Sequence, residues 1–167
     1  MHRPKLWKIL ERPNYSSGRE YCDALIALGY RPSDWIIDIA YKPYFPVCTV
    51  RWPLPLVRVK LEMFGFKEPT TLEEFYNVAL GEGFENPPPE SALALRLKYD
   101  EQPKGEWLRV ATKMDAMVDS DDVPHLPKLG AAINRFYLET YWAYSGAIFH
   151  PHNEFVMVDP SAIGCPA

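Results

Sequence analysis

The hydrophobic positions of the first 46 residues recur at helical spacing. Between Ser17 and Gly29 the apolar side chains share one face, with a serine as the N-terminal cap and a glycine where a left-handed residue ends a helix. The segment DWIIDIAY, residues 34–41, has the same spacing and follows Ser33. The pattern therefore predicts two helices in this part of the chain.

A third helix is predicted over residues 71–82. Thr71 and Glu74 have the spacing of a capping box, in which a hydroxyl and a carboxylate each satisfy a free backbone N–H group. Leu72 and Phe75 follow at helical spacing, and Gly81 is suited to ending the helix.

After three consecutive prolines, residues 87–89, the hydrophobic period falls from about 3.6 to about 2. Leucines alternate with smaller or charged residues over Leu93–Tyr99, and a second alternating run covers Glu106–Met114. Between these runs lies QPKG, residues 102–105, with a proline and a glycine placed as in a tight turn. The sequence therefore predicts a β-hairpin.

Further strands complete the expected fold class. They are predicted in residues 47–52, 56–64, 135–144 and 154–159. Helices precede strands, so we expect an α+β fold in which N-terminal helices pack on a C-terminal, mainly antiparallel sheet. One domain is expected over residues 1–167, with a helical part up to about residue 46 and a β-rich part from about residue 47 that contains the helix at 71–82.

Composition and charge restrict the possible partners. The 18 basic and 22 acidic residues give a net charge of −4, which argues against nucleic-acid binding and against a polybasic membrane anchor. No apolar run approaches the roughly 18 residues of a membrane span, and the start of the chain lacks the apolar region of a signal peptide. The three cysteines form no CxxC pair. We expect a soluble cytoplasmic protein without a cofactor.

Several short segments resemble the recurring pattern of a group of small uncharacterised bacterial proteins, usually labelled hypothetical. That pattern has a GFKEGAT helix start, then LRLQYxDQPxGEWL, then TDSDG, and it ends in a Trp-containing strand and a strand of the RFVF type. The matching segments here are GFKE (65–68), LRLKY (95–99), QP (102–103), GEWL (105–108), DSD (119–121) and EFV (154–156). The resemblance implies a shared fold and a bacterial origin, and it implies no activity.

Histidines provide the main enzymatic hypothesis. His150, His152 and Glu154 occupy alternate positions and would share one face of an extended chain, and His125 could join them from elsewhere. The bacterial group has an acid–proline–acid arrangement in place of HPH, so the resemblance assigns these histidines no role. Together with nearby acids they form the candidate site of a hydrolase or transferase, whereas the proline between them favours a polar loop, and we expect no metal.

Other candidate sites lack the spacing that their chemistry needs. An EF-hand counted from Asp119 would place Pro124 at the invariant glycine and Gly130 at the final glutamate, so the acids at 115–122 are interpreted as a solvated turn. The chain contains no GxSxG, GxGxxG or GKS/T motif. A helix-turn-helix over residues 17–41 would present acids to DNA.

Aromatic residues give the preferred functional hypothesis. In the strand at 135–144, Tyr137 and Tyr141 point away from Trp142, and Trp107 lies on a strand expected to be its neighbour. If the helices cover one sheet face, the other presents aromatic rings, which dominate protein-binding surfaces. Such a strand can also be covered on both faces. We expect a non-enzymatic binding protein that uses Tyr137, Tyr141, Trp107 and Trp142 for self-association, as in a homo-oligomer, or for a protein partner.

Overall fold

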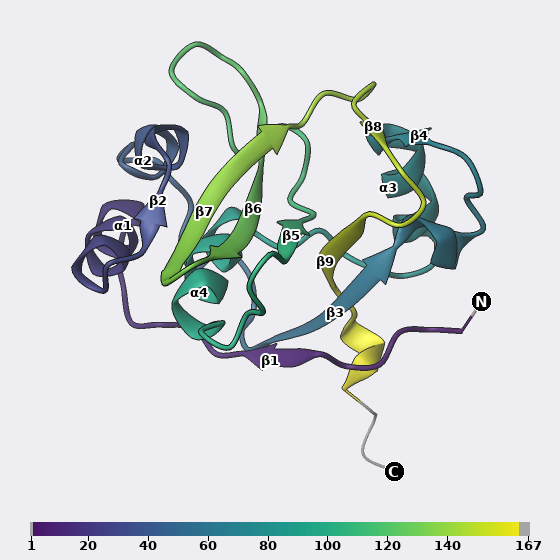
Figure 1. The fold of residues 1–167 in the computed structure, drawn as a ribbon, viewed down its shortest axis with the longest axis horizontal. Helices are drawn as coiled ribbons and strands as arrows, with labels where there is room; N and C mark the ends of the chain where they lie inside the picture. Colours follow the sequence, from purple (N-terminus) through teal and green to yellow (C-terminus); the bar gives the residue numbers. More distant parts are fainter. Residues whose placement is uncertain (1, 164–167) are drawn as a thin grey trace.

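The computed structural model describes residues 2–163 as a seven-stranded sheet with helices on both faces, beside a two-stranded ribbon (Figure 1). The strand order is β1-β3-β9-β5-β6-β7-β2. Its strands are β1 (Lys8–Leu10), β2 (Arg31–Pro32), β3 (Leu54–Lys60), β5 (Trp107–Val110), β6 (His125–Ala132), β7 (Arg135–Trp142) and β9 (Glu154–Val158). The ribbon pairs β4 (Thr70–Thr71) with β8 (Ile148–Phe149).

The helices are α1 (Gly18–Ala27), α2 (Asp34–Ala40), α3 (Leu72–Gly81) and α4 (Pro89–Lys98), with short 3-10 helices η1 (Leu61–Phe64) and η2 (Pro160–Ala162). Neighbouring sheet strands are antiparallel, except that β5 runs parallel to β9 and β2 runs parallel to β7. The predicted α+β class with helices packed on a mainly antiparallel sheet is therefore confirmed.

The three predicted helices are present, and each begins at its predicted cap. Ser17 and Ser33 accept hydrogen bonds from backbone N–H groups in the first turns of α1 and α2, and Thr71 does the same for α3. Gly29 has φ 80°, as a helix-ending glycine should. The Glu74 carboxylate accepts from Thr70 rather than completing the capping box with Thr71.

Two apolar cores lie on opposite faces of the sheet. On one face α1, α2 and α4 cover Leu108, Leu129 and Leu138 from the central strands. On the other face α3 packs on β3 and β9, where Phe75 contacts Phe155 with ring centroids 4.9 Å apart. The second core reaches only part of its face, which leaves β5, β6 and β7 less covered there.

The predicted hairpin over Leu93–Tyr99 and Glu106–Met114 is wrong, because residues 89–98 form α4. Pro89 occupies the first turn, where its missing N–H is no loss. Every residue from Pro89 to Arg96 is buried, so α4 has no polar face and no helical period in its sequence. The alternation of leucine and alanine resembled a strand, although both residues favour helices.

Arg96 is fully buried and joins α4 to the sheet. One terminal nitrogen donates to the side-chain oxygen of Gln102 at 2.7 Å and to the carbonyls of Gly130 and Tyr137 at 3.2 Å each, and the other donates to the carbonyl of Tyr99 at 2.6 Å. Burial lowers its pKa to about 10, so the guanidinium stays charged at neutral pH. Neutral carbonyls rather than a carboxylate hold this cation.

Tyr99 and the segment QPKGEWL, residues 102–108, have structural roles around Arg96. The Gln102 amide also donates to the carbonyl of Leu129, and Gly105 has φ 88° in the turn before β5. Glu106 accepts from the Tyr99 hydroxyl at 2.7 Å and pairs with Arg58 at 3.0 Å. The QPxGEWL segment thus ties the end of α4 to the sheet, which is a folding role.

Three strands of the sheet, β1, β2 and β6, were not predicted, and the strand predicted at residues 47–52 is absent. β6 lies in residues that looked like an insertion, because HLPKLGAA contains a proline and lacks a simple alternation. Pro127 pairs with Thr140 by register inside the sheet. Residues 47–52 form no strand, since Cys48 has φ 55° and its N–H donates to Glu90.

Replacing Arg96 with methionine is expected to lower the free energy of unfolding by about 3 kcal/mol or more, because several buried carbonyls lose their donor. Urea denaturation followed by circular dichroism measures the change. Lys98→Met, at an exposed position in the same last helical turn, is the matched control and should stay within about 0.5 kcal/mol of wild type. Equal changes in the free energy of unfolding for both variants would mean that the hydrogen bonds of Arg96 do not stabilise the fold.

Candidate binding face

The sheet face opposite α1, α2 and α4 is divided into a covered and an open part. Over β3 and β9 it lies beneath α3 and the β4–β8 ribbon, and the contact of Tyr141 with Phe149 marks the border, with ring centroids 5.3 Å apart. Over β5, β6 and β7 most side chains on this face are half-buried or exposed, although Leu126 is buried, and 43% of Trp107 is exposed. We call this part the open face; it comprises Trp107, Arg109, Lys128, Tyr137, Glu139 and Tyr141.

Strand register arranges the open face in rows. Trp107, Gly130 and Tyr137 form one row across β5, β6 and β7. The next row brings together three charged residues, which are Arg109, Lys128 and Glu139. A row of charges therefore lies beside a row of aromatic rings.

Gly130 allows the Trp107 ring to lie flat across β6. A Cβ atom at Gly130 would stand 2.3 Å from the Trp107 ring, which no real contact permits. The indole thereby reaches toward Tyr137, with ring centroids 6.4 Å apart. A substituted residue at this position would displace the indole from the face.

Arg109 is a largely desolvated cation without a carboxylate partner. Its Nε–H is buried and finds no acceptor among residues 2–163. The guanidinium carbon lies 5.5 Å from the ring centres of both Tyr141 and Phe149. Burial lowers the pKa of Arg109, as expected for a charge removed from water, and no neighbouring carboxylate offsets this.

Lys128 places a second positive charge directly beside Arg109. Its Nζ atom lies 5.0 Å from the Trp107 ring centre and 5.8 Å from that of Tyr141. The pKa of Lys128 is lowered, first by burial and then by repulsion from Arg109, while Glu139 acts in the opposite direction. Like charges opposite each other on neighbouring strands destabilise a sheet.

Sequence reasoning located the aromatic residues of this face but not its charges. Arg109 alternates with Leu108 and Val110, so the pattern that placed Trp107 also placed Arg109 on the same face. Lys128 was missed because β6 was missed. The face becomes cationic only when both strands are in place.

One predicted binding residue lies elsewhere. Trp142 is on the opposite sheet face from Tyr137 and Tyr141, where its ring centre lies 6.2 Å from that of Trp35 in α2. Trp107 and Trp142 are not on neighbouring strands, because β6 separates β5 from β7. The four predicted aromatic residues thus do not form one surface.

The histidines of the enzymatic hypothesis also divide into separate places. His150 and His152 are exposed and stack on each other, with ring centroids 5.7 Å apart, in the loop between β8 and β9. The Glu154 carboxylate pairs with Arg58 at 2.5 Å. His125 instead bonds Asp119 and Thr140. Within residues 2–163, no three His, Cys, Asp or Glu side chains are grouped as metal ligands.

The acidic turn is only partly solvated, contrary to the interpretation from sequence. Asp121 and Asp122 are exposed, but Asp119 is buried, with only 7% of its surface accessible to solvent. The Asp119 carboxylate accepts from the N–H groups of Asp121 and Val123 at 2.8 and 3.0 Å and bonds His125 through its other oxygen. The backbone bonds of Asp119 shape the turn, which a count of charges cannot show.

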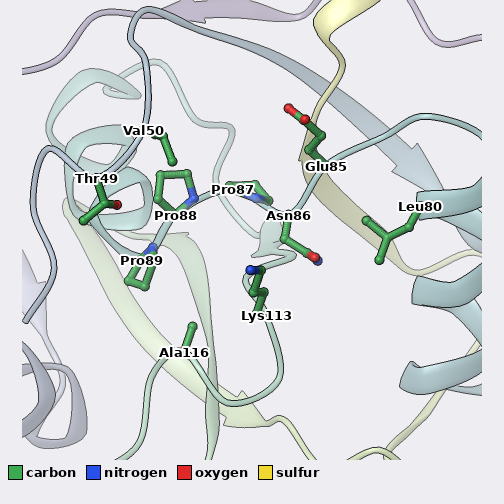
Figure 2. A pocket seen from close by; sticks show the side chains of 10 residues that line it. All are labelled: Thr49, Val50, Leu80, Glu85, Asn86, Pro87, Pro88, Pro89, Lys113 and Ala116. Atoms are coloured by element: carbon green, nitrogen blue, oxygen red, sulfur yellow. The ribbon is translucent and has the colours of Figure 1, made fainter.

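A separate groove lies beside the three prolines, as Figure 2 shows, with a volume of about 490 Å³. Its walls are mainly apolar and include Val50 and Leu80. Among its polar residues, Asn86 donates its amide to the carbonyl of Ala111 at 2.9 Å. Lys113 and Glu85 are exposed at its rim, and they bring charges of both signs. The groove therefore lacks the one-sided charge of the open face.

Comparisons with models of protein families, with curated proteins and with solved structures returned no match. Among the residues that the structure describes, no helix is both long and apolar enough to cross a membrane.

Replacing Arg109 with methionine is expected to raise the free energy of unfolding by about 0.5–2 kcal/mol, because a buried unpaired charge is removed while apolar packing is kept. Arg58→Met is the contrasting variant. Arg58 pairs with Glu106 and Glu154, so its loss should lower the free energy by about 1–3 kcal/mol. Urea denaturation of both variants measures the difference. Destabilisation by Arg109→Met would mean that Arg109 supports the fold.

Proposed function

We propose that this protein is a binding module whose open face receives an acidic segment of a partner protein. The observation that carries the proposal is the juxtaposition of Arg109 and Lys128, two adjacent cations that form no ion pair with a carboxylate among residues 2–163. A carboxylate from a partner would supply the acceptor that the fold leaves out.

Desolvation favours the binding of a carboxylate to Arg109. A buried N–H group without an acceptor costs about 1–3 kcal/mol, and more when the group is charged. Much of that cost to Arg109 is already present in the free protein. A carboxylate that binds it therefore gains a charge-assisted bond without a further large desolvation of the arginine.

The aromatic rings around these cations provide the apolar part of the surface. Trp107 is exposed, and Tyr137 and Tyr141 are half-buried, so their rings lie at the margin between core and solvent. Tryptophan, tyrosine and arginine are the residue types that contribute most to protein-binding energy. Apolar residues that alternate with acids in the partner would contact rings and cations together.

Charge favours a foreign partner over a second copy of this chain. The open face carries Arg109 and Lys128 against the single carboxylate of Glu139. Two copies packed face to face would bury an excess of positive charge, and unpaired buried charges are strongly unfavourable. An acidic partner segment has no such conflict.

A capped peptide of alternating glutamate and leucine tests the proposal, with the glutamine–leucine peptide as its control. Titration followed by NMR at the Trp107 indole N–H and the Arg109 Nε–H should show saturation. The glutamate peptide should bind at least roughly tenfold more tightly, the equivalent of about one charge-assisted bond. Equal affinity of the two peptides would contradict the proposal.

Matched variants separate the face from general charge attraction. Arg109→Gln combined with Lys128→Gln should remove the preference for glutamate. Lys67→Gln combined with Lys104→Gln removes the same charge from exposed positions and should keep the preference. Equal losses in both double variants would mean that net charge alone attracts the peptide. Light scattering is the second measurement and gives the oligomeric state. If the wild type is a dimer and Tyr137→Ser is a monomer, a second copy of this chain binds the open face, which would contradict the proposal.

A further inference from the structure

A pocket of about 170 Å³ lies between α2 and the strands β6 and β7. It is lined by Trp35 of α2 and by His125, Thr140, Tyr141 and Trp142 of β6 and β7. Trp35 and Trp142 are 48% and 46% exposed, which is unusual for large apolar rings and leaves them accessible to a ligand.

Three of the aromatic residues that line this pocket have rings close to one another. The ring centres of Trp35 and Trp142 are 6.2 Å apart with an interplanar angle of 61°, so the two indoles meet as a corner. The His125 ring lies 5.5 Å from each of them, tilted by 34° to both. The faces of aromatic rings carry negative electrostatic potential, so a pocket lined by such residues can attract a cation.

The orientation of His125 is fixed by hydrogen bonds on both ring nitrogens. Its Nε2 lies 2.8 Å from the Asp119 carboxylate, and its Nδ1 lies 3.0 Å from the Thr140 hydroxyl. The hydrogen bond to His125 holds the pKa of Asp119 below its ordinary value, so Asp119 is a carboxylate that can only accept. Nε2 therefore donates to Asp119, and a buried carboxylate lies within hydrogen-bond distance of the His125 ring.

Two further acidic residues lie on the same helix as Trp35. Asp34 is exposed next to Trp35 in the first turn of α2, and Asp38 follows one turn later. Lys42 lies 3.7 Å from Asp38, which partly offsets its charge. With Asp119 included, the three carboxylates outnumber this one cation, in contrast to the cationic open face.

From this geometry we propose that the pocket binds an alkylammonium group, meaning a nitrogen that bears methyl substituents and a positive charge. Aromatic faces attract such cations, and the attraction grows when the cation is desolvated. The volume has room for about five water-sized groups, which is the scale of a nitrogen with its methyl groups. A carboxylate or phosphate would be repelled by Asp119. This inference does not depend on the open face.

Choline and 3,3-dimethylbutan-1-ol test the proposal, because they share a shape and differ in charge. NMR titration of the Trp35 and Trp142 indole N–H signals, at constant ionic strength, should give saturable shifts with choline. The neutral alcohol should bind at least roughly tenfold more weakly, since it lacks the cation–π attraction. Equal shifts from both compounds, or no saturable shift with choline, would overturn the proposal.

Variants locate the binding and identify the source of the group. Trp142→Leu should weaken choline binding at least fivefold, by analogy with about 1 kcal/mol of cation–π energy. Tyr44→Leu changes an exposed ring outside the pocket and should leave it unchanged. Equal effects of these two variants would also overturn the proposal. A trimethyllysine peptide that binds more tightly than choline identifies a modified protein as the source, and the reverse order identifies a small molecule.

Discussion

The fold depends on how a buried guanidinium is satisfied. Arg96 projects from α4 and donates to the carbonyls of Gly130 and Tyr137, which are paired across β6 and β7. The same two residues form a row of the open face with Trp107. Burying a charge is costly unless hydrogen bonds replace its water, so the fold is most stable when these strands lie where the carbonyls can reach Arg96. The core thereby fixes the positions of the residues on the opposite sheet face.

Arg109 presents the opposite case in the same sheet. Arg96 is more deeply buried, and its terminal nitrogens have four carbonyl or amide oxygens as acceptors, although its Nε–H has none among residues 2–163. Arg109 lies 5.5 Å from two aromatic ring centres, and its buried Nε–H also has no acceptor there. A fold that gives one arginine four oxygen acceptors and gives a second, half-buried arginine no carboxylate partner has a local conflict, and such conflicts concentrate at functional sites. This contrast supports a binding role for the open face.

The sequence predicted those elements whose signals are local. Capping serines and threonine, with glycines at the ends, located α1, α2 and α3, because caps depend on nearby backbone groups. α4 was mistaken for a strand because a helix buried on all sides has no polar period, and β6 was missed because a proline interrupts it. The aromatic residues were found, but pairing Arg109 with Lys128 needs the strand register, which a single sequence does not contain.

The central claim is that the terminal nitrogens of Arg96 have their acceptors inside the fold, whereas Arg109 binds a carboxylate acceptor supplied by a partner. Side-chain NMR of arginine tests it directly, by measuring rotation about the Nε–Cζ bond in the free protein and after addition of the glutamate–leucine peptide. The account predicts slow rotation for Arg96 in both states, and rotation of Arg109 that is fast in the free protein and slow with the peptide. Slow rotation of Arg109 in the free protein, unchanged by the peptide, would contradict it.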